Sequence, residues 1–410
     1  MPLALDVKLS KLFVVEDRDD VVPFIVRVRG VGSLRTRSVY LVALDSSWSM
    51  DGSKIFFAKD SVLRMVRLLD PEDYISVYSF YGRIVKVLDM EKIGNADKIV
   101  RAVADIRLGG GTNIYSVLEH MYADVTRVRE ELKSKEQGAV PGIKMVMVTD
   151  GNPTVGVRDG DRILDMAGKL GKHVSVSLVI GVGEDYNEKL LSGIASKTNG
   201  FFEHLEDPAK MPDLVEKMAS AYRELSAKNL RILIKTAPGV GVYIYNKPAY
   251  ASRGGVEVEI GDVYEGETIN VVGEFLVPPQ KRGMSYLATV TGIYTESGGA
   301  EKELSPNTVT IPCVHTVPPD AVEVDNTVFR EVNLIRVASI ITKDLYGQLS
   351  VDKLMNVLED IVNSTIAVEN RELYTRTIDL KAHLAKEGLS PDVVKKVVAL
   401  ISRILSGRYE

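Results

Sequence analysis

The feature that most constrains the fold is a regular alternation of apolar and amphipathic segments between Ser38 and about Ser226. The apolar segments "VYLVAL", "YISVYSF", "IKMVMVT" and "VSVSLVIGVG" have the composition of strands that are buried on both faces. The segments between them carry apolar residues at helical spacing, as in those that start at Asn187 and Asp207. The alternation predicts an α/β fold with a doubly wound, mostly parallel sheet that is covered by helices on both sides.

The sequence on either side of this unit has a different period. After Asn229, six segments alternate between apolar and polar residues and are separated by Gly, Asn and Pro turns, which is typical of an antiparallel β-sandwich. The chain begins with two segments of the same character, "LALDVKLSKLFVV" and "VPFIVRVRG". Because edge strands need partners, we assign both ends to one sandwich, into which the α/β unit is inserted.

The chain has 410 residues, which is long for a single hydrophobic core, so we divide it into regions. Residues 1–37 give the first strands of the sandwich, 38–227 the α/β domain, 228–318 the rest of the sandwich and 319–410 a helical region. The predicted C-terminal helices run from Asn326 to Leu345, Val351 to Ile366, Arg371 to Glu387 and Pro391 to Leu405.

Composition excludes several classes of protein. A net charge of −5 provides no basic surface for nucleic acid or anionic lipid. A single cysteine, Cys313, cannot form an intramolecular disulfide or a thiolate metal cluster. No apolar run approaches the ~18 residues that span a bilayer, and the first residues lack the apolar core of a secretory signal. We therefore expect a cytoplasmic protein without a nucleic-acid or membrane partner.

Three polar loops follow or face the ends of the predicted parallel strands. We call them loop one (Asp45 to Ser49), loop two (Gly109 to Thr112) and loop three (Thr149 to Gly151). In a doubly wound sheet the first and fourth strands are neighbours, so Asp45 and Asp150 are expected side by side at the ligand-binding edge. Two carboxylates and three hydroxyls suit a hard divalent cation such as Mg²⁺.

This constellation resembles the metal-ion-dependent adhesion site of the von Willebrand factor A domain family. The family pattern, D-x-S-x-S followed by Thr and then Asp, is met by Asp45, Ser47, Ser49, Thr112 and Asp150. The resemblance implies Mg²⁺ or Mn²⁺ held directly by the three hydroxyls and by the aspartates directly or through water. It also implies a free coordination position for an acidic residue of a partner protein.

The overall layout is similar to that of intracellular prokaryotic members of the family. Such members resemble the scaffold proteins of regulatory complexes. Some of these complexes also contain AAA+ ATPases or forkhead-associated proteins. The resemblance therefore implies a binding module and scaffold rather than an enzyme.

Three of the five ligand residues also have a simpler interpretation. Thr112 fits a helix N-cap and Asp150-Gly151 a tight turn, while Ser49 or Ser53 fits a cap of the first helix. If the simpler interpretations were correct, three unrelated polar residues would lie at one sheet edge by coincidence. The metal site explains their common location and is therefore favoured. Trp48, the chain's one tryptophan, either projects toward a partner, as tryptophans at binding hot spots do, or packs over the first helix.

Two other functions compete with metal-dependent binding. A Mg²⁺-dependent phosphatase of the haloacid dehalogenase type would also place an aspartate after the first strand, and Asp161 and Asp165 mimic its later acidic motif. However, its second acid is replaced by Ser47 here, and Asp161 and Asp165 fit the first turn of a helix. The other alternative is a structural scaffold that does not use the metal site.

Overall fold

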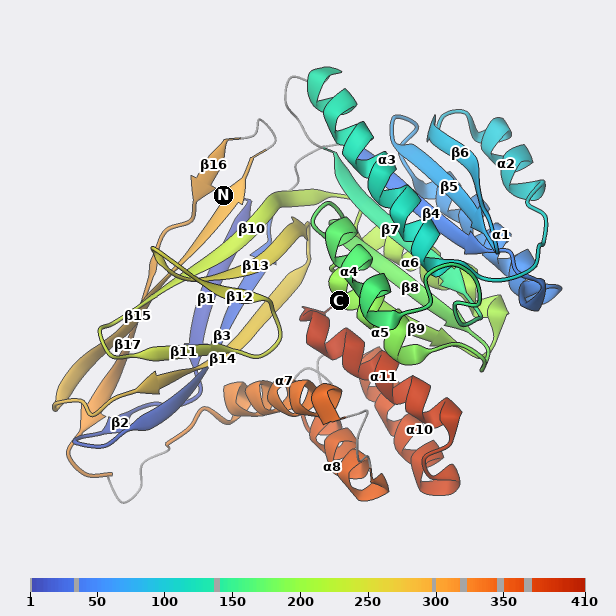
Figure 1. Ribbon diagram of the computed structural model, residues 1–410. Helices are drawn as coiled ribbons and strands as arrows, with labels where there is room; N and C mark the ends of the chain where they lie inside the picture. The colour runs from blue at the N-terminus through green and yellow to red at the C-terminus, as the bar shows by residue number, and fades with distance from the viewer. Residues whose placement is uncertain are drawn as a thin grey trace.

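The computed structural model describes residues 2–32, 37–135, 141–296, 300–317, 323–344, 350–364 and 371–409. Three parts lie against one another: an α/β unit, a pair of β-sheets and a group of C-terminal helices (Figure 1). In the described part of the chain, no helix combines the length and apolar character needed to cross a bilayer.

The α/β unit contains a six-stranded sheet in the order β6-β5-β4-β7-β8-β9. Its strands are β4 (Ser38–Asp45), β5 (Tyr74–Phe80), β6 (Ile84–Lys92), β7 (Gly142–Thr149), β8 (Val176–Val182) and β9 (Phe201–Leu205). All neighbouring pairs are parallel except β5 and β6, which are antiparallel. The chain direction across the sheet reverses at β4, so the loops after β4 and β7 meet at one edge, as predicted.

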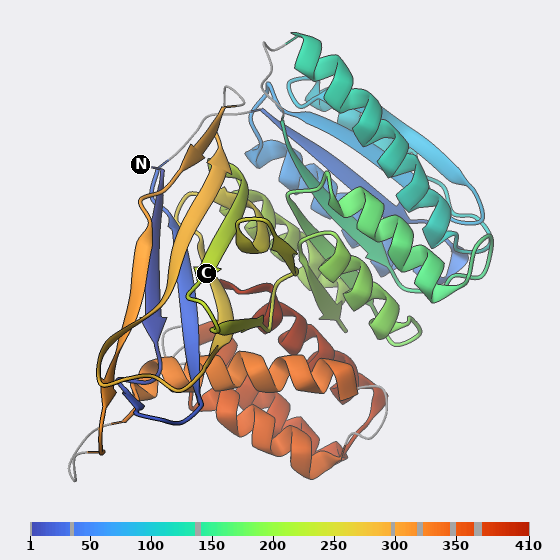
Figure 2. The same ribbon diagram turned by 60° about the vertical axis from the view of Figure 1, so that its left-hand side comes forward.

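Six helices cover the two faces of this sheet. They are α1 (Ser53–Leu68), α2 (Ala96–Ala104), α3 (Ile114–Lys135), α4 (Gly160–Gly171), α5 (Glu188–Lys197) and α6 (Met211–Ala221). One hydrophobic cluster joins the sheet to α3, α4 and α5, and another joins its opposite face to α1, α2 and α6 (Figures 1 and 2). This arrangement confirms the predicted doubly wound fold.

The remaining strands form two sheets that share one hydrophobic core. The first sheet contains β1 (Leu3–Leu9), β3 (Asp20–Gly30), β11 (Gly241–Ile244), β14 (Thr268–Val277) and β18 (Arg408–Tyr409). The second contains β2 (Val14–Val15), β10 (Leu225–Thr236), β12 (Ala249–Ser252), β13 (Gly255–Tyr264), β15 (Gly283–Thr295), β16 (Glu301–Glu303) and β17 (Asn307–Val314).

Strands from before and after the α/β unit lie in the same sheet. β3 pairs with β14 in antiparallel register from Asp20 opposite Val277 to Arg29 opposite Thr268. The predicted insertion of the α/β unit into a β-sandwich is therefore present. Among the described strands of these two sheets, all neighbouring pairs are antiparallel except β2 and β17, which are parallel.

The chain leaves the α/β unit earlier than the sequence pattern indicated. The helical spacing of apolar residues in the segment that starts at Asp207 continues to Leu225, but Leu225 is the first residue of β10 and pairs with Tyr264. The helix α6 ends at Ala221. Leu225 is buried in the core of the α/β unit from its strand position, so its apolar character is satisfied without the extra helical turn.

Among the described residues after 323, four helices lie against both of the other parts (Figure 2). They are α7 (Asn326–Asp344), α8 (Val351–Val362), α10 (Arg371–Glu387) and α11 (Pro391–Ser406). α7 packs against β3 and β14, while α11 packs against β9 and α5. The predicted helix ends at Leu345 and Ile366 and the predicted boundary between 318 and 319 lie outside the described residues. The boundaries at 37/38 and 227/228 stay predictions, and the second falls within β10.

Candidate metal centre

Loop one leaves the carboxyl end of β4 and passes through a short 3-10 helix, Trp48–Met50, before α1 begins. Asp45 is the last residue of β4, and its Oδ1 accepts a hydrogen bond of 2.8 Å from the backbone N–H of Ser47. The loop backbone is fixed on both sides, since Ser46 N–H donates to Phe80 O and Gly109 N–H donates to Ser46 O, each at 2.8 Å. Loop one is therefore held between loop two and the end of β5.

Loop three meets loop one directly. Thr149 Oγ1 donates a hydrogen bond to Asp45 Oδ2, and Ser49 Oγ donates one of 2.8 Å to Asp150 Oδ1. The hydroxyl oxygens of Ser47 and Ser49 are 3.0 Å apart. A continuous network of hydrogen bonds therefore links both aspartates and both serines.

Loop two completes the cluster through Thr112. Its N–H donates a hydrogen bond of 2.8 Å to Thr154 Oγ1, and its carbonyl accepts one of 2.9 Å from Thr154 N–H. Its Oγ1 lies 3.5 Å from the place that a Cβ on Gly151 would take. Gly111 has φ +81°, and a Cβ there would lie 2.5 Å from Val155 Cγ2, so the loop backbone requires glycine at this position. The structure thus brings all five predicted ligand residues to one sheet edge.

The simpler roles of two hydroxyls do not match the geometry. The N-cap of α1 is Gly52, without a side-chain cap, so Ser49 does not cap that helix. At the start of α3, Asn113 Oδ1 accepts the hydrogen bond of 3.2 Å from Ser116 N–H, so Asn113 and not Thr112 makes the N-cap bond.

The two carboxylates are buried, with 0% of Asp45 and 1% of Asp150 exposed to solvent. The pKa of Asp45 is raised to about 6, and burial is the main cause. The charge of Asp150 also raises it, while hydrogen bonds from Thr149 and Ser47 lower it. Two acids that are buried on adjacent strands call for a cation between or beside them.

The donor set fits a hard divalent cation. It consists of two carboxylates and three hydroxyls, which are the oxygen ligands that Mg²⁺ and Mn²⁺ prefer. Ser49 is exposed, so the cluster can be reached from solvent despite the burial of its aspartates.

The sequence reasoning missed one side chain that contacts the oxygen cluster. Lys54 Nζ lies 2.6 Å from Asp150 Oδ2 and 3.2 Å from the carbonyl oxygen of Ser49. A usable signal was present, because Lys54 stands in the first turn of α1, where the helix dipole disfavours a cation. A lysine at that position indicates a nearby anion.

Trp48 projects from loop one and does not join the core, since 65% of it is exposed. Its Nε1 lies 3.9 Å from the place that a Cβ on Gly110 would take, which puts the ring beside loop two. Phe56 on α1 is also exposed, at 63%. Two large apolar side chains, one on loop one and one on α1, are therefore exposed to solvent.

The acids of the phosphatase alternative lie elsewhere. Asp161 and Asp165 are exposed on α4, whose N-cap is Asp159. Asp161 occupies the first turn of that helix, as predicted. The same prediction is wrong for Asp165, which is the sixth residue of α4 and therefore lies in its second turn.

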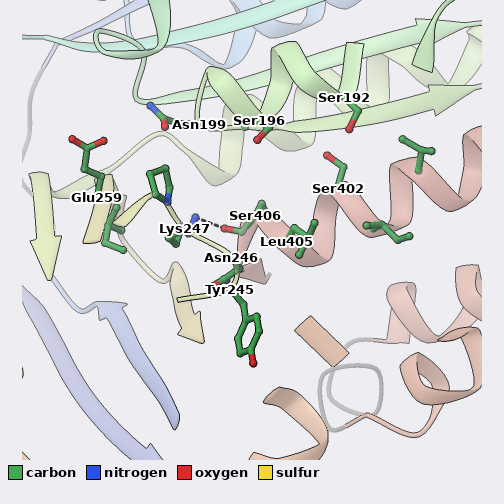
Figure 3. A pocket seen from close by; sticks show the side chains of 15 residues that line it. Ser192, Ser196, Asn199, Tyr245, Asn246, Lys247, Glu259, Ser402, Leu405 and Ser406 are labelled. Atoms are coloured by element: carbon green, nitrogen blue, oxygen red, sulfur yellow. Dashed lines mark hydrogen bonds between the residues drawn. The ribbon is translucent and has the colours of Figure 1, made fainter. Parts of the chain in front are cut away.

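A separate pocket of about 320 Å³ lies where the three parts of the chain meet (Figure 3). Ser192 and Ser196 line it from α5, Ser402 and Ser406 from α11, and Tyr245 to Pro248 from the β-sandwich. Lys247 Nζ donates a hydrogen bond to the carbonyl oxygen of Ser406 across it. None of its lining residues belongs to loops one to three.

The fold and the oxygen cluster together define a class of protein. Residues 41–217 match the family model of the von Willebrand factor type A domain. Domains of this family generally serve as adhesion or protein-interaction modules, and they often bind a divalent metal ion at this position of the fold.

Individual relatives cover more of the chain. An uncharacterized protein of Synechocystis is 24% identical over 254 residues, which is 58% of this chain and 58% of that protein. A von Willebrand factor type A structure from Catenulispora acidiphila has a TM-score of 0.78 at 14% identity and covers 98% of this chain and 96% of that one. The ArnB paralog VWA2 from Sulfolobus acidocaldarius has a TM-score of 0.67 at 23% identity, over 98% of each chain. These structures share the fold of the chain over almost its whole length.

Proposed function

We propose that the chain is a metal-dependent protein-interaction module rather than an enzyme. In this proposal, loops one to three hold Mg²⁺ or Mn²⁺ and present it to an aspartate or glutamate of a partner protein. The observation that carries the proposal is the hydrogen-bonded network that joins Asp45, Ser47, Ser49 and Asp150, with Thr112 beside it.

The chain's residues have distinct roles in this proposal. Ser47, Ser49 and Thr112 would supply neutral hydroxyl ligands, and Asp45 and Asp150 would bind directly or through water. A divalent ion bound by so few charged ligands keeps an exchangeable water that a carboxylate can replace. Thr149 and the backbone of Ser47 orient Asp45 by hydrogen bonds to both of its oxygens.

The exposed ring of Trp48 supports a protein rather than a small ion as the partner. Exposed aromatic side chains beside a charged site exclude water from a contact and are enriched among the residues that dominate binding energy. We propose that Trp48 contacts the partner next to its acidic residue.

Two alternatives are weaker. A Mg²⁺-dependent phosphatase would need a second acid where the chain has Ser47, and its later acids would have to approach the site, whereas Asp161 and Asp165 lie exposed on α4. A purely structural scaffold would not need five oxygen side chains from three loops at one point.

The finer biological setting rests on the resemblance alone. We propose an intracellular regulatory or assembly complex in the cytoplasm, with a forkhead-associated or AAA+ protein as a candidate partner.

The test is a comparison of partner capture in Mg²⁺ and in EDTA. The wild-type chain and Asp161→Ala, a matched aspartate change outside the site, should retain the same partner in Mg²⁺ and lose it in EDTA. Asp45→Ala should not retain it in either buffer. The captured partner should lose binding when one of its acids is changed to the amide. Equal capture in EDTA would overturn the proposal.

A further inference from the structure

Lys54 occupies an unusual place for a lysine. It is the second residue of α1, and the partial positive charge at a helix N-terminus disfavours a cation there. Its side chain is 28% exposed, yet its ammonium points back to the oxygen cluster and contacts Asp150 and the carbonyl of Ser49. The contact with Asp150 offsets this unfavourable position.

With this contact, each carboxylate oxygen of Asp150 accepts a hydrogen bond. One carboxylate oxygen accepts from Ser49 Oγ at 2.8 Å and the other from Lys54 Nζ at 2.6 Å. Gly183 also lies near the ammonium, since a Cβ at this residue would be 3.5 Å from Nζ. Its φ of +78° is a backbone conformation that favours glycine.

The charges at the site make Lys54 and a divalent cation competitors. Asp45 and Asp150 together carry two negative charges when ionised, and Lys54 balances one of them. A divalent ion that uses Asp150 must share this carboxylate with the ammonium or displace it, and like charges a few ångströms apart repel strongly in a buried site.

We propose that Lys54 is a built-in counter-ion that takes the place of the metal ion on Asp150 and thereby sets the metal affinity of the site. Its ammonium holds loop three against loop one when no metal is bound, and it lowers the affinity for metal because it must give up Asp150 Oδ2. The inference rests on the proposed function, since it assumes that the cluster binds a divalent ion.

The test compares Lys54→Met with the wild-type chain and with Lys59→Met. Lys59 lies on the same helix, but its Nζ donates to the carbonyls of Ala104 and Ile106, away from the cluster. The control variant therefore removes the same charge from α1 without touching Asp150. Two readouts are measured: Mn²⁺ affinity from the electron paramagnetic resonance signal of free Mn²⁺, and the thermal unfolding midpoint in EDTA and in Mn²⁺.

Lys54→Met should bind Mn²⁺ at least about tenfold more tightly than the other two proteins, since a buried carboxylate is freed for the metal. Its midpoint should fall in EDTA, where Asp150 is left without a counter-ion, and rise more than the wild-type midpoint when Mn²⁺ is added. Lys54→Gln removes the charge but keeps a hydrogen-bond donor, and it should also bind Mn²⁺ more tightly than the wild-type chain and Lys59→Met. It replaces Lys54→Met in the comparison if that variant does not fold.

The two possible failures are distinguishable. Equal or weaker Mn²⁺ binding by Lys54→Met than by the wild-type chain overturns the role of Lys54 and leaves the proposed function in place. Failure of every variant and of the wild-type chain to bind Mn²⁺ overturns both.

Discussion

Glu203 on β9 and Arg376 on α10 form a two-point ion pair, in which Arg376 Nη1 lies 2.9 and 3.2 Å from the two carboxylate oxygens. Arg403 on α11 adds a third contact of 3.3 Å to the same carboxylate. The side chain of Glu203 is only 4% exposed, so one buried acid connects two C-terminal helices to the edge strand of the α/β unit.

The first prediction concerns this contact. Glu203→Gln should lower the free energy of unfolding by about 2 kcal/mol, because it removes a charged partner of two arginines. The effect should not be larger, because both arginines are partly exposed and water can solvate their charges. Urea unfolding measures the change. Glu206→Gln is the matched control, since Glu206 is 54% exposed and its pair with Lys396 should contribute less than about 1 kcal/mol. Equal effects of the two variants would contradict the role of Glu203.

The second prediction concerns pH. The pKa of His204 is lowered, mainly by burial, and the charge of Lys395 lowers it as well. The hydrogen bond and charge of Asp392 and the charge of Glu206 act in the opposite direction, but they do not outweigh burial. Its Nδ1 faces the hydroxyl of Tyr186, and its Nε2 lies 3.0 Å from Asp392 Oδ1. The folded chain therefore favours the neutral imidazole more than the unfolded chain does, whose histidine has a pKa of about 6.5.

The sign of this effect follows from proton linkage. Below pH ~6.5 the unfolded state binds more protons than the folded state at this residue, so stability decreases as the pH falls. Urea unfolding of the wild-type chain between pH 8 and pH 5 should show this decrease, and His204→Gln should flatten it. An identical slope in both proteins would show that other groups cause it.

The third prediction concerns the inserted architecture. Deletion of residues 1–30 removes β1 and β3, which leaves the β3 side of β14 as an open edge and removes Arg27 from the largely buried Glu331. The truncated chain should aggregate, as measured by size-exclusion chromatography and light scattering. A monomeric, stably folded product would show that the sandwich does not depend on its N-terminal strands.

The fourth prediction separates partner contact from metal binding. Trp48→Ala should weaken binding of the captured partner by about 2 kcal/mol, the scale of a hot-spot residue, and leave Mn²⁺ affinity unchanged. The exposed ring does not contribute a ligand atom to the cluster, so its loss should act on the partner alone. Loss of Mn²⁺ binding in Trp48→Ala would instead give the ring a structural role in loop one.

Much of the fold could be predicted because the relevant signals are local. The alternation of strands and helices fixed the reversal of the sheet beside β4, and with it the meeting of Asp45 and Asp150. The short strands β12, β16 and β18 and the early end of α6 were missed, because pairing with distant strands decides them. Leu225 shows this, since its apolar side chain suits a helix end as well as a strand start.

The site could also be predicted only where its signals are local in the sequence. Loop residues at strand ends were identifiable from sequence, whereas contacts between side chains from different elements were not. Lys54 reaches Asp150 across loop one, and Glu203 pairs with helices far along the chain. The helix-dipole rule shows that Lys54 needs an anion but not which one.

The central claim is tested most directly by titration of the metal-free chain with Mn²⁺, followed by electron paramagnetic resonance of the free ion. The wild-type chain and Asp161→Ala should bind one ion, while Asp45→Ala and Asp150→Ala should lose that binding and keep the far-ultraviolet circular dichroism of a folded chain. Unchanged Mn²⁺ affinity in both Asp45→Ala and Asp150→Ala would contradict the metal centre at loops one to three.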